Sequence, residues 1–301
     1  MGRIWRVRGA SLGGGNLPLL VGIVNATPDS FFDGGKHATA DEAYAHGMKL
    51  VEEGADLLDV GGESTRLGSE PVDPSEERRR VEPVIRSLAR RGARVCIDTR
   101  TTSVAEAALD AGACAVNDVS GLADPAMLEL CRAHGAGACA MHMRANPSLP
   151  QVRQVAWIPA CAMHMRANPS LSEVESSQED LEREIERLFE DISRRWVRSG
   201  LDPQGLALDP GVGFGKTAEE NQRLVGATAR FRRRFPAYPW YLGLSRKSWI
   251  RPLAPEGSDR LAGSLGGALA AFQAGCDILR VHDVARTREA ILAFQACRED
   301  A

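Results

Sequence analysis

Polar residues of the types used in catalysis follow short apolar runs at eight places in this sequence. Carboxylate and amide oxygens can accept hydrogen bonds from a heterocycle with several N–H groups, and Arg, Lys and His can neutralise phosphate oxygens. The residues at these run ends are Asn25, Asp59, Asp98, Asn117, Asp118, His142, Asp209, Ser245, Arg280 and His282. Helix capping or a turn explains any single one equally well. Capping explains all eight ends less readily, so the pattern indicates one shared active site.

Three loops after these runs add groups suited to closure or to anion binding. Residues 25–31 combine polar groups with a proline and precede two glycines, a composition typical of a mobile lid. Residues 61–66 hold two glycines, two hydroxyls and the guanidinium of Arg66, which suits phosphate, although a plain turn is the alternative. Residues 209–216 are rich in glycine but lack both the Walker A and the GxGxxG spacing. A nucleotide site is therefore not predicted.

The eight apolar runs alternate with amphipathic or alanine-rich segments of helical length. The expected strands lie within residues 17–25, 55–62, 94–98, 114–118, 137–143, 205–211, 240–245 and 276–283. Expected helices include residues 41–53, 75–91, 103–111, 181–198 and 257–275. Alternating strands and helices imply parallel strands joined by crossover helices. The sequence predicts an α/β fold, a (β/α)8 TIM barrel, with residues 1–301 as a single domain.

Cationic residues follow the last two expected strands. Lys247 lies in the segment SRKS, and strand alternation would point Arg280 and His282 to the same side. In (β/α)8 enzymes this sector often holds phosphate. The carboxylates of Asp98 and Asp209 suit a heterocycle, and an ion pair inside the barrel is the alternative. The sequence contains no Ser-His-Asp order, HExxH motif or paired-Cys metal site.

The composition argues against several classes of protein and partner. The net charge is −3, which argues against nucleic acid or an acidic membrane surface as partner. The apolar run within 17–24 is short and leads into a polar residue, so we expect a strand and not a signal peptide. No apolar stretch is long enough to span a bilayer, and a cytoplasmic protein is expected. The 7 cysteines are odd in number and never form CxxC, which favours buried free thiols.

A tandem duplication interrupts the regular pattern. The sequence ACAMHMRANPSL occurs at residues 138–149 and again at 160–171, an offset of 22 residues. Two copies are too few for a solenoid, so a local duplication of 138–159 as 160–181 is the better interpretation. Only one copy can supply the fifth strand if the barrel closes with eight.

The motifs NATPDSFFDGG, GADLLDVGGESTR, CIDT, AVNDVSG, MHM, LDPGVGFGKT, GLSRKS and RVHDV, taken together, resemble the dihydropteroate synthase family, in that family's order, over residues 21–284. The resemblance implies condensation of 6-hydroxymethyl-7,8-dihydropterin diphosphate with p-aminobenzoate, giving 7,8-dihydropteroate and diphosphate in folate biosynthesis. It also implies Mg2+, a homodimer and a sulfonamide target. Positioning and electrostatics would supply most of the catalysis, with no covalent enzyme intermediate.

The resemblance carries roles to individual residues. The pterin-holding positions are Asp98, Asn117, Asp209 and Lys247, and the ring pocket is lined by Phe214 with Met141 or its duplicate Met163. The diphosphate positions are Asn25, Arg66, Arg280 and His282, with Asn25 also holding Mg2+. The two loops that close over p-aminobenzoate contain Asp29, Ser30, Phe31, Thr65 and Arg66. The residues expected to act in catalysis are Asn25, Asp29, Arg66, Lys247, Arg280 and His282.

The chain departs from the family pattern in both loops. Leu67 stands where Pro is typical, and Phe32 stands where Ser is usual. Losing the proline relaxes φ and can reshape the aromatic-amine pocket. We hypothesise reduced sensitivity to sulfonamides, and equal inhibition of the native enzyme and Leu67→Pro would count against it.

The duplication leaves two ways to build the fifth strand. The number of residues from Asn117 to His142 matches the spacing that the family has before the MHM motif. The number of residues from His164 to Asp180 matches the spacing that the family has after it. We predict that the first copy forms the strand and that residues 149–158 become an inserted loop. The second copy remains the alternative.

Two rival functions share the pterin pocket. The first is a non-catalytic pterin-binding paralogue, in which the altered loops prevent p-aminobenzoate capture. The second is a methyl transferase that binds methyltetrahydrofolate on a similar barrel, which should lack the TPDSF and SRKS segments. Retention of Asn25, Arg66, Lys247 and His282 favours the synthase.

Overall fold

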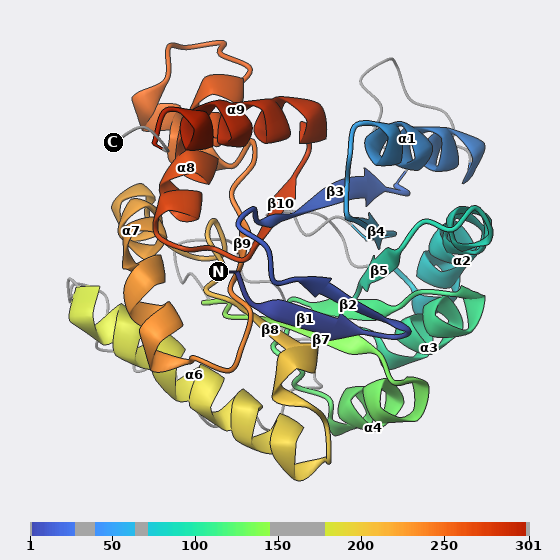
Figure 1. Ribbon diagram of the computed structural model, residues 1–301. Helices are drawn as coiled ribbons and strands as arrows, with labels where there is room; N and C mark the ends of the chain where they lie inside the picture. The colour runs from blue at the N-terminus through green and yellow to red at the C-terminus, as the bar shows by residue number, and fades with distance from the viewer. Residues whose placement is uncertain (1, 28–39, 64–71, 145–177, 299–301) are drawn as a thin grey trace.

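Eight parallel strands form a single sheet that curls into a barrel (Figure 1). The computed structural model describes residues 2–27, 40–63, 72–144 and 178–298. The sheet order is β8-β7-β6-β5-β4-β3-β10-β9. The strands are β3 (Leu19–Asn25), β4 (Leu57–Gly61), β5 (Val95–Asp98), β6 (Ala115–Asp118), β7 (Gly137–Met141), β8 (Leu206–Asp209), β9 (Tyr241–Gly243) and β10 (Ile278–Val281). All eight predicted strands are confirmed.

The barrel is nearly closed between β8 and β9. A single parallel bridge joins Leu208 to Trp240, and the Leu208 amide donates to the Pro239 carbonyl at 3.0 Å. The predicted (β/α)8 barrel is therefore confirmed.

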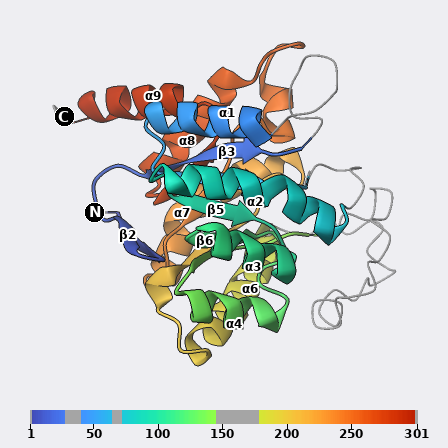
Figure 2. The same ribbon diagram turned by 90° about the vertical axis from the view of Figure 1, so that its right-hand side faces the viewer.

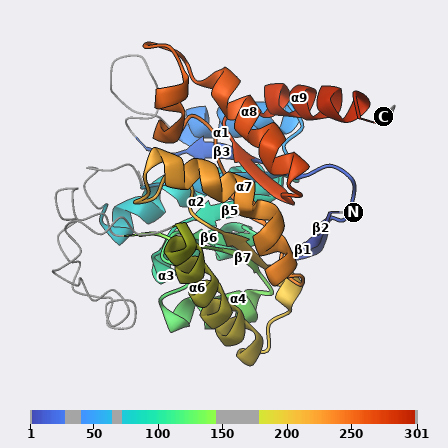
Figure 3. The same cartoon turned by 90° about the vertical axis from the view of Figure 1, so that its left-hand side faces the viewer.

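The α-helices of the described ranges surround the strands in Figure 1, and Figure 3 shows α6, α7 and α8 from the side. They are α1 (Ala40–Glu52), α2 (Pro74–Arg90), α3 (Thr102–Ala111), α4 (Pro125–His134), α6 (Gln178–Arg198), α7 (Ala218–Arg234), α8 (Leu261–Gln273) and α9 (Val284–Ala296). Two 3-10 helices are η1 (Pro203–Gly205) and η2 (Ser248–Leu253). The helices α4, α7 and α9 add to the five predicted segments. No helix within the described ranges is long and apolar enough to cross a membrane.

Sequence signals fix several helix starts. Asp73 caps α2 by accepting from the Ser75 amide, and Pro74 occupies the first turn, where a missing N–H has no cost. The start of α7 is a capping box, in which Thr217 and Glu220 each accept from the other's backbone amide.

An antiparallel hairpin of β1 (Ile4–Val7) and β2 (Ala10–Gly13) covers the amino-terminal ends of the strands, as Figure 2 shows from the side. Trp5 is fully buried there, and its Nε1 donates to the Gly205 carbonyl at 3.2 Å. The Trp5 ring also meets the Tyr241 ring edge-on at 6.3 Å. The sequence did not predict this hairpin. Because it closes one end of the barrel with apolar contacts, chemistry is left to the opposite end.

The fifth barrel strand is β7, so it is built from residues of the first copy of the duplication. The second copy and the predicted insert at 149–158 lie outside the described residues. Five of the cysteines are buried and free, as predicted, whereas Cys297 is exposed.

Candidate active site

The strand register brings the predicted polar residues to one end of the barrel. Asn25 pairs with Gly61, Gly61 with Asp98, and Asp98 with Asn117, so these residues lie in one row across four strands. Asp209 ends β8 as the register partner of Met141. The carboxyl end of the barrel therefore presents amide and carboxylate groups side by side.

Arg280 on β10 lies inside the barrel between two carboxylates. Its Nε donates to Asp59 Oδ2 at 2.5 Å, and its Nη2 donates to Asp98 Oδ2 at 2.7 Å. Burial is the largest cause of a change in the pKa of the Asp98 carboxyl, and it raises that pKa. Arg280 lowers the pKa, and the fully buried Asp59 raises it further. The ion pair that was the alternative for Asp98 is therefore present, and it consists of one cation shared by two anions.

Asn117 belongs to the same cluster. Its Nδ2 donates to Asp59 Oδ2 at 3.0 Å, and the side chain is buried. Because the amide nitrogen is turned toward Asp59, the orientation of the amide group is fixed by this bond.

Lys247 reaches toward the strand ends from the segment after β9. Its Nζ donates to the Val212 carbonyl and lies 4.4 Å from the centre of the Phe214 ring. A Cβ at Gly243 would lie 3.5 Å from that Nζ and 3.8 Å from Arg280 Cδ. Burial lowers the pKa of Lys247 to about 8, and nearby Asp209 partly offsets the effect. Lys247 and Arg280 therefore both lie beside Gly243 of β9.

Asp209 is held by the Gly-rich loop that follows it. Its Oδ1 accepts from the Gly211 amide at 2.8 Å, and burial raises the pKa of its carboxyl. Gly211 has φ +71°, and a Cβ there would lie 1.8 Å from the His142 carbonyl oxygen. Glycine is therefore required at this close approach of the loop to the end of β7.

Lys216 also stabilises the Gly-rich loop after β8. Its Nζ donates to the carbonyls of Gly211 at 2.9 Å, His142 at 3.1 Å and Phe214 at 3.2 Å. Burial lowers its pKa to about 7. The three carbonyl partners follow the ends of β7 and β8, so this ammonium joins the two segments and supports the shape of the loop.

His282 is oriented by the segment after β9. Its Nδ1 lies 3.0 Å from Ser245 Oγ, and its backbone amide donates to the same oxygen at 3.3 Å. Arg246 pairs with Asp283 through two contacts of 2.5 and 3.0 Å. The loops after β9 and β10 are therefore tied together where the cations gather.

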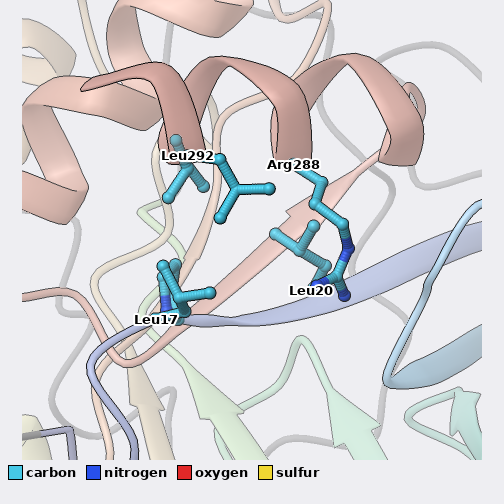
Figure 4. A pocket seen from close by; sticks show the side chains of 6 residues that line it. Leu17, Leu20, Arg288 and Leu292 are labelled. Carbon is cyan, nitrogen blue, oxygen red and sulfur yellow. The ribbon is translucent and has the colours of Figure 1, made fainter. Parts of the chain in front are cut away.

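A small cavity elsewhere in the molecule does not compete with this site. It has a volume of about 10 Å3, room for about one water, and lies between α9 and the start of β3 (Figure 4). Its lining includes Leu17, Leu20, Arg288 and Leu292. These are mostly apolar side chains, away from the polar strand ends.

Comparison with known proteins agrees with this geometry. The family described as pterin binding enzyme matches residues 21–157 and 150–282, two segments that meet at the duplication. The dihydropteroate synthase of Neisseria meningitidis serogroup C is 39% identical over 284 residues, covering 93% of this chain and 92% of that protein. The chain belongs to the dihydropteroate synthase family.

Solved structures of dihydropteroate synthases share the fold. The Xanthomonas albilineans synthase with 4-aminobenzoic acid has a TM-score of 0.82 and 36% identity, covering 99% of both chains. The same organism's synthase in complex with 7,8-dihydropteroate has a TM-score of 0.79 and 34% identity, covering 98% of both chains.

Within this dihydropteroate synthase fold, the described part of the chain brings most of the predicted pterin and diphosphate residues to one end of the barrel. These are Asn25, Asp98, Asn117, Met141, Asp209, Phe214, Lys247, Arg280 and His282. Other predicted residues lie outside the described ranges: Asp29, Ser30, Phe31, Phe32, Thr65, Arg66, Leu67 and Met163.

Sequence reasoning gave no role to Asp59 or Lys216, which organise this dihydropteroate synthase site. The sequence pattern marked Asp59 only as a polar residue at the end of an apolar run, and Lys216 is the last residue of the Gly-rich segment 209–216. Lys216 is also one of only four lysines in the sequence. The scarcity of lysine was a usable signal for Lys216, because a chain that prefers arginine keeps ammonium groups where geometry demands them.

Proposed function

We infer that this barrel condenses 6-hydroxymethyl-7,8-dihydropterin diphosphate with p-aminobenzoate, giving 7,8-dihydropteroate and diphosphate in folate biosynthesis. Family membership over 93% of the chain supports this function. The single structural observation that carries it is the convergence of Lys247 and Arg280 beside the carboxylates of Asp98 and Asp209. A ligand that is both a polar heterocycle and an anion matches that arrangement.

The carboxylates and the ammonium would hold the pterin. Asp98 and Asp209 accept hydrogen bonds from the N–H groups of the aminopyrimidine edge, and Lys247 donates to ring acceptors. Met141 is buried at the end of β7, and Phe214 lies under the Lys247 ammonium, so both suit contact with a flat ring. Burial strengthens each of these hydrogen bonds because competing water is excluded.

Arg280 and His282 would neutralise the leaving group. The bond between the pterin methylene carbon and the diphosphate oxygen breaks, and the electron pair leaves with the diphosphate. The amine nitrogen of p-aminobenzoate forms the new C–N bond and loses a proton. The electron-rich pterin delocalises positive charge left on the methylene, and the guanidinium stabilises charge on the departing oxygens.

Asn25 suits the predicted Mg2+ site in a limited way. It ends β3 with a partly exposed side chain, and no group of three or more His, Cys, Asp or Glu residues within the described ranges could hold a metal ion. Mg2+ commonly takes one or two protein oxygens and completes its shell with phosphate oxygens and waters. The amide oxygen of Asn25 beside a diphosphate matches this mode of coordination. When bound, Mg2+ would add positive charge at the phosphate oxygens.

The loops containing Asp29, Ser30, Phe31, Thr65 and Arg66 remain the proposed closure over p-aminobenzoate. A homodimer is also part of the proposal, and light scattering on the purified protein tests it.

Lys247→Met is expected to raise the dissociation constant for 6-hydroxymethylpterin by about 10- to 100-fold, since a charged hydrogen-bond donor is lost. Thermal stability should not fall, because burial lowers the pKa of Lys247 and therefore disfavours its charged form in the folded protein. Titration calorimetry measures the affinity. Lys49→Met is the matched control, since Lys49 is exposed on α1. Unchanged pterin affinity in Lys247→Met would remove this residue from the site.

We expect kcat/KM for the pterin substrate to be highest within a narrow pH range and to fall on both sides of it. Asp98 must be ionised to accept hydrogen bonds, so kcat/KM for the pterin substrate is expected to fall as pH drops through its pKa, raised to about 7. Lys247 must be protonated to donate, so kcat/KM falls again as pH rises through its pKa of about 8. A pH profile of kcat/KM checks both limbs. In Lys247→Arg the alkaline limb should disappear, and an unchanged alkaline limb would show that another group titrates there.

A further inference from the structure

We propose that Asp59 is a positioning residue that orients Asn117 and Arg280 together, and so couples pterin recognition to neutralisation of the leaving diphosphate. The proposal rests on the proposed function. Asp59 Oδ2 accepts from Asn117 Nδ2 at 3.0 Å and from Arg280 Nε at 2.5 Å. One carboxylate oxygen therefore fixes a side chain of the pterin group and a side chain of the diphosphate group.

The place of Asp59 in the sheet makes this coupling possible. In the strand order, β4 lies two places from β6 and two places from β10. Asp59 thus reaches over β5 on one side and over β3 on the other, inside the barrel. The two partners come from strands that do not pair with each other, so Asp59 is their common support.

The depth of Asp59 separates its role from that of a ligand-contacting group. Its register partner is Cys96, whereas Gly61, two residues further along β4, pairs with Asp98. Asp59 lies one layer below the row of Asp98 and is 0% exposed. A substrate at the strand ends would meet Asn117 and Arg280 before it met Asp59.

The shared guanidinium explains why a second carboxylate is useful. Arg280 contacts Asp98 through Nη2 and Asp59 through Nε. When Asp98 takes up pterin N–H groups, the bond to Asp59 still holds the guanidinium in place. Small misplacements of a catalytic group are costly, so this anchor should matter for both ligands.

The test compares Asp59→Asn with Asp277→Asn. The Asn variant of Asp59 keeps the size of the side chain and removes its charge. Asp277 is also a buried carboxylate, and it lies at the other end of the barrel. It accepts from the Arg3 amide at 2.8 Å and from the buried Trp240 amide at 2.9 Å, and it pairs with the half-buried Arg232 at 3.2 Å. Titration calorimetry with 6-hydroxymethylpterin and with inorganic diphosphate gives two affinities for each variant, and thermal unfolding gives their stability.

Asp59→Asn is expected to weaken both ligands by about 10-fold or more, since each depends on a side chain that the charge holds. Asp277→Asn should lower stability and leave both affinities unchanged. Wild-type affinity for either ligand in Asp59→Asn overturns the coupling, whatever its stability, and leaves the proposed function intact.

A second measurement needs neither a variant nor a ligand. In the ligand-free wild-type protein, the Arg280 Nε–H signal in a 1H–15N spectrum should exchange slowly with water, because Asp59 accepts this hydrogen inside the barrel. Exchange as fast as that of an exposed arginine such as Arg79 would overturn the proposal. Failure of the wild-type protein to bind pterin would instead contradict the proposed function, and the exchange rate would then test only whether Asp59 holds the Arg280 guanidinium.

Discussion

Arg280→Met is expected to lower kcat/KM by about 100- to 1,000-fold, the range typical for removing a donor that stabilises developing negative charge. The guanidinium would be lost from the leaving diphosphate. Asp59 and Asp98 would also lose the cation they share, which raises the pKa of Asp98 further and keeps its carboxyl protonated at neutral pH. Both consequences act against the same reaction.

Steady-state kinetics on the purified variant checks this result. Arg280→Lys should fall between the wild type and Arg280→Met, because an ammonium keeps the charge but cannot serve two carboxylates through separate N–H groups. Arg132→Met is the matched control. The Arg132 guanidinium is exposed on α4, where its ion pair is with the exposed Glu129. Activity of Arg280→Met within a few-fold of the wild type would rule out its role at the leaving group.

Gly211→Ala is expected to lower the free energy of unfolding by about 3 kcal/mol or more and to reduce kcat/KM by about 100-fold. The new Cβ would lie 1.8 Å from the His142 carbonyl oxygen, at a residue with φ +71°. The loop must move to relieve this contact. Its movement would displace the Gly211 amide from Asp209 and the Gly211 carbonyl from Lys216.

Gly226→Ala provides the control for this change. Gly226 lies in α7, and a Cβ there meets no atom within 4 Å. The substitution should stabilise the protein by about 0.4–1 kcal/mol, because alanine loses less conformational freedom on folding. Thermal unfolding of both variants measures the difference, and equal stability would contradict the account of the loop.

The barrel strands were predictable because each couples a buried apolar run to a polar end, and the parallel arrangement follows from helices between them. The hairpin of β1 and β2 was not predictable, because its alternating Arg and apolar residues resemble an ordinary polar terminus. Its role depends on Trp5, which is buried at the end of the barrel. Short, isolated hairpins depend on tertiary contacts more than on their own pattern.

The sequence predicted which polar residues gather at one end of the barrel, but it did not predict how their side chains bond to one another. Family motifs located Asp98, Asn117 and Arg280, but no spacing along the chain indicates that one oxygen of Asp59 serves two of them. That link depends on strands β4, β6 and β10 meeting inside a closed sheet. The duplication is a different case, because the two copies have the same local sequence and the spacing to the flanking motifs predicted that the first copy forms the strand, as β7 (Gly137–Met141) does.

The most direct test of the central claim is release of diphosphate from 6-hydroxymethyl-7,8-dihydropterin diphosphate by the purified protein with Mg2+ present. We predict that release requires p-aminobenzoate and yields one 7,8-dihydropteroate for each diphosphate. Tight pterin binding with no p-aminobenzoate-dependent release would contradict this claim and would identify the chain as a non-catalytic pterin-binding member of its family.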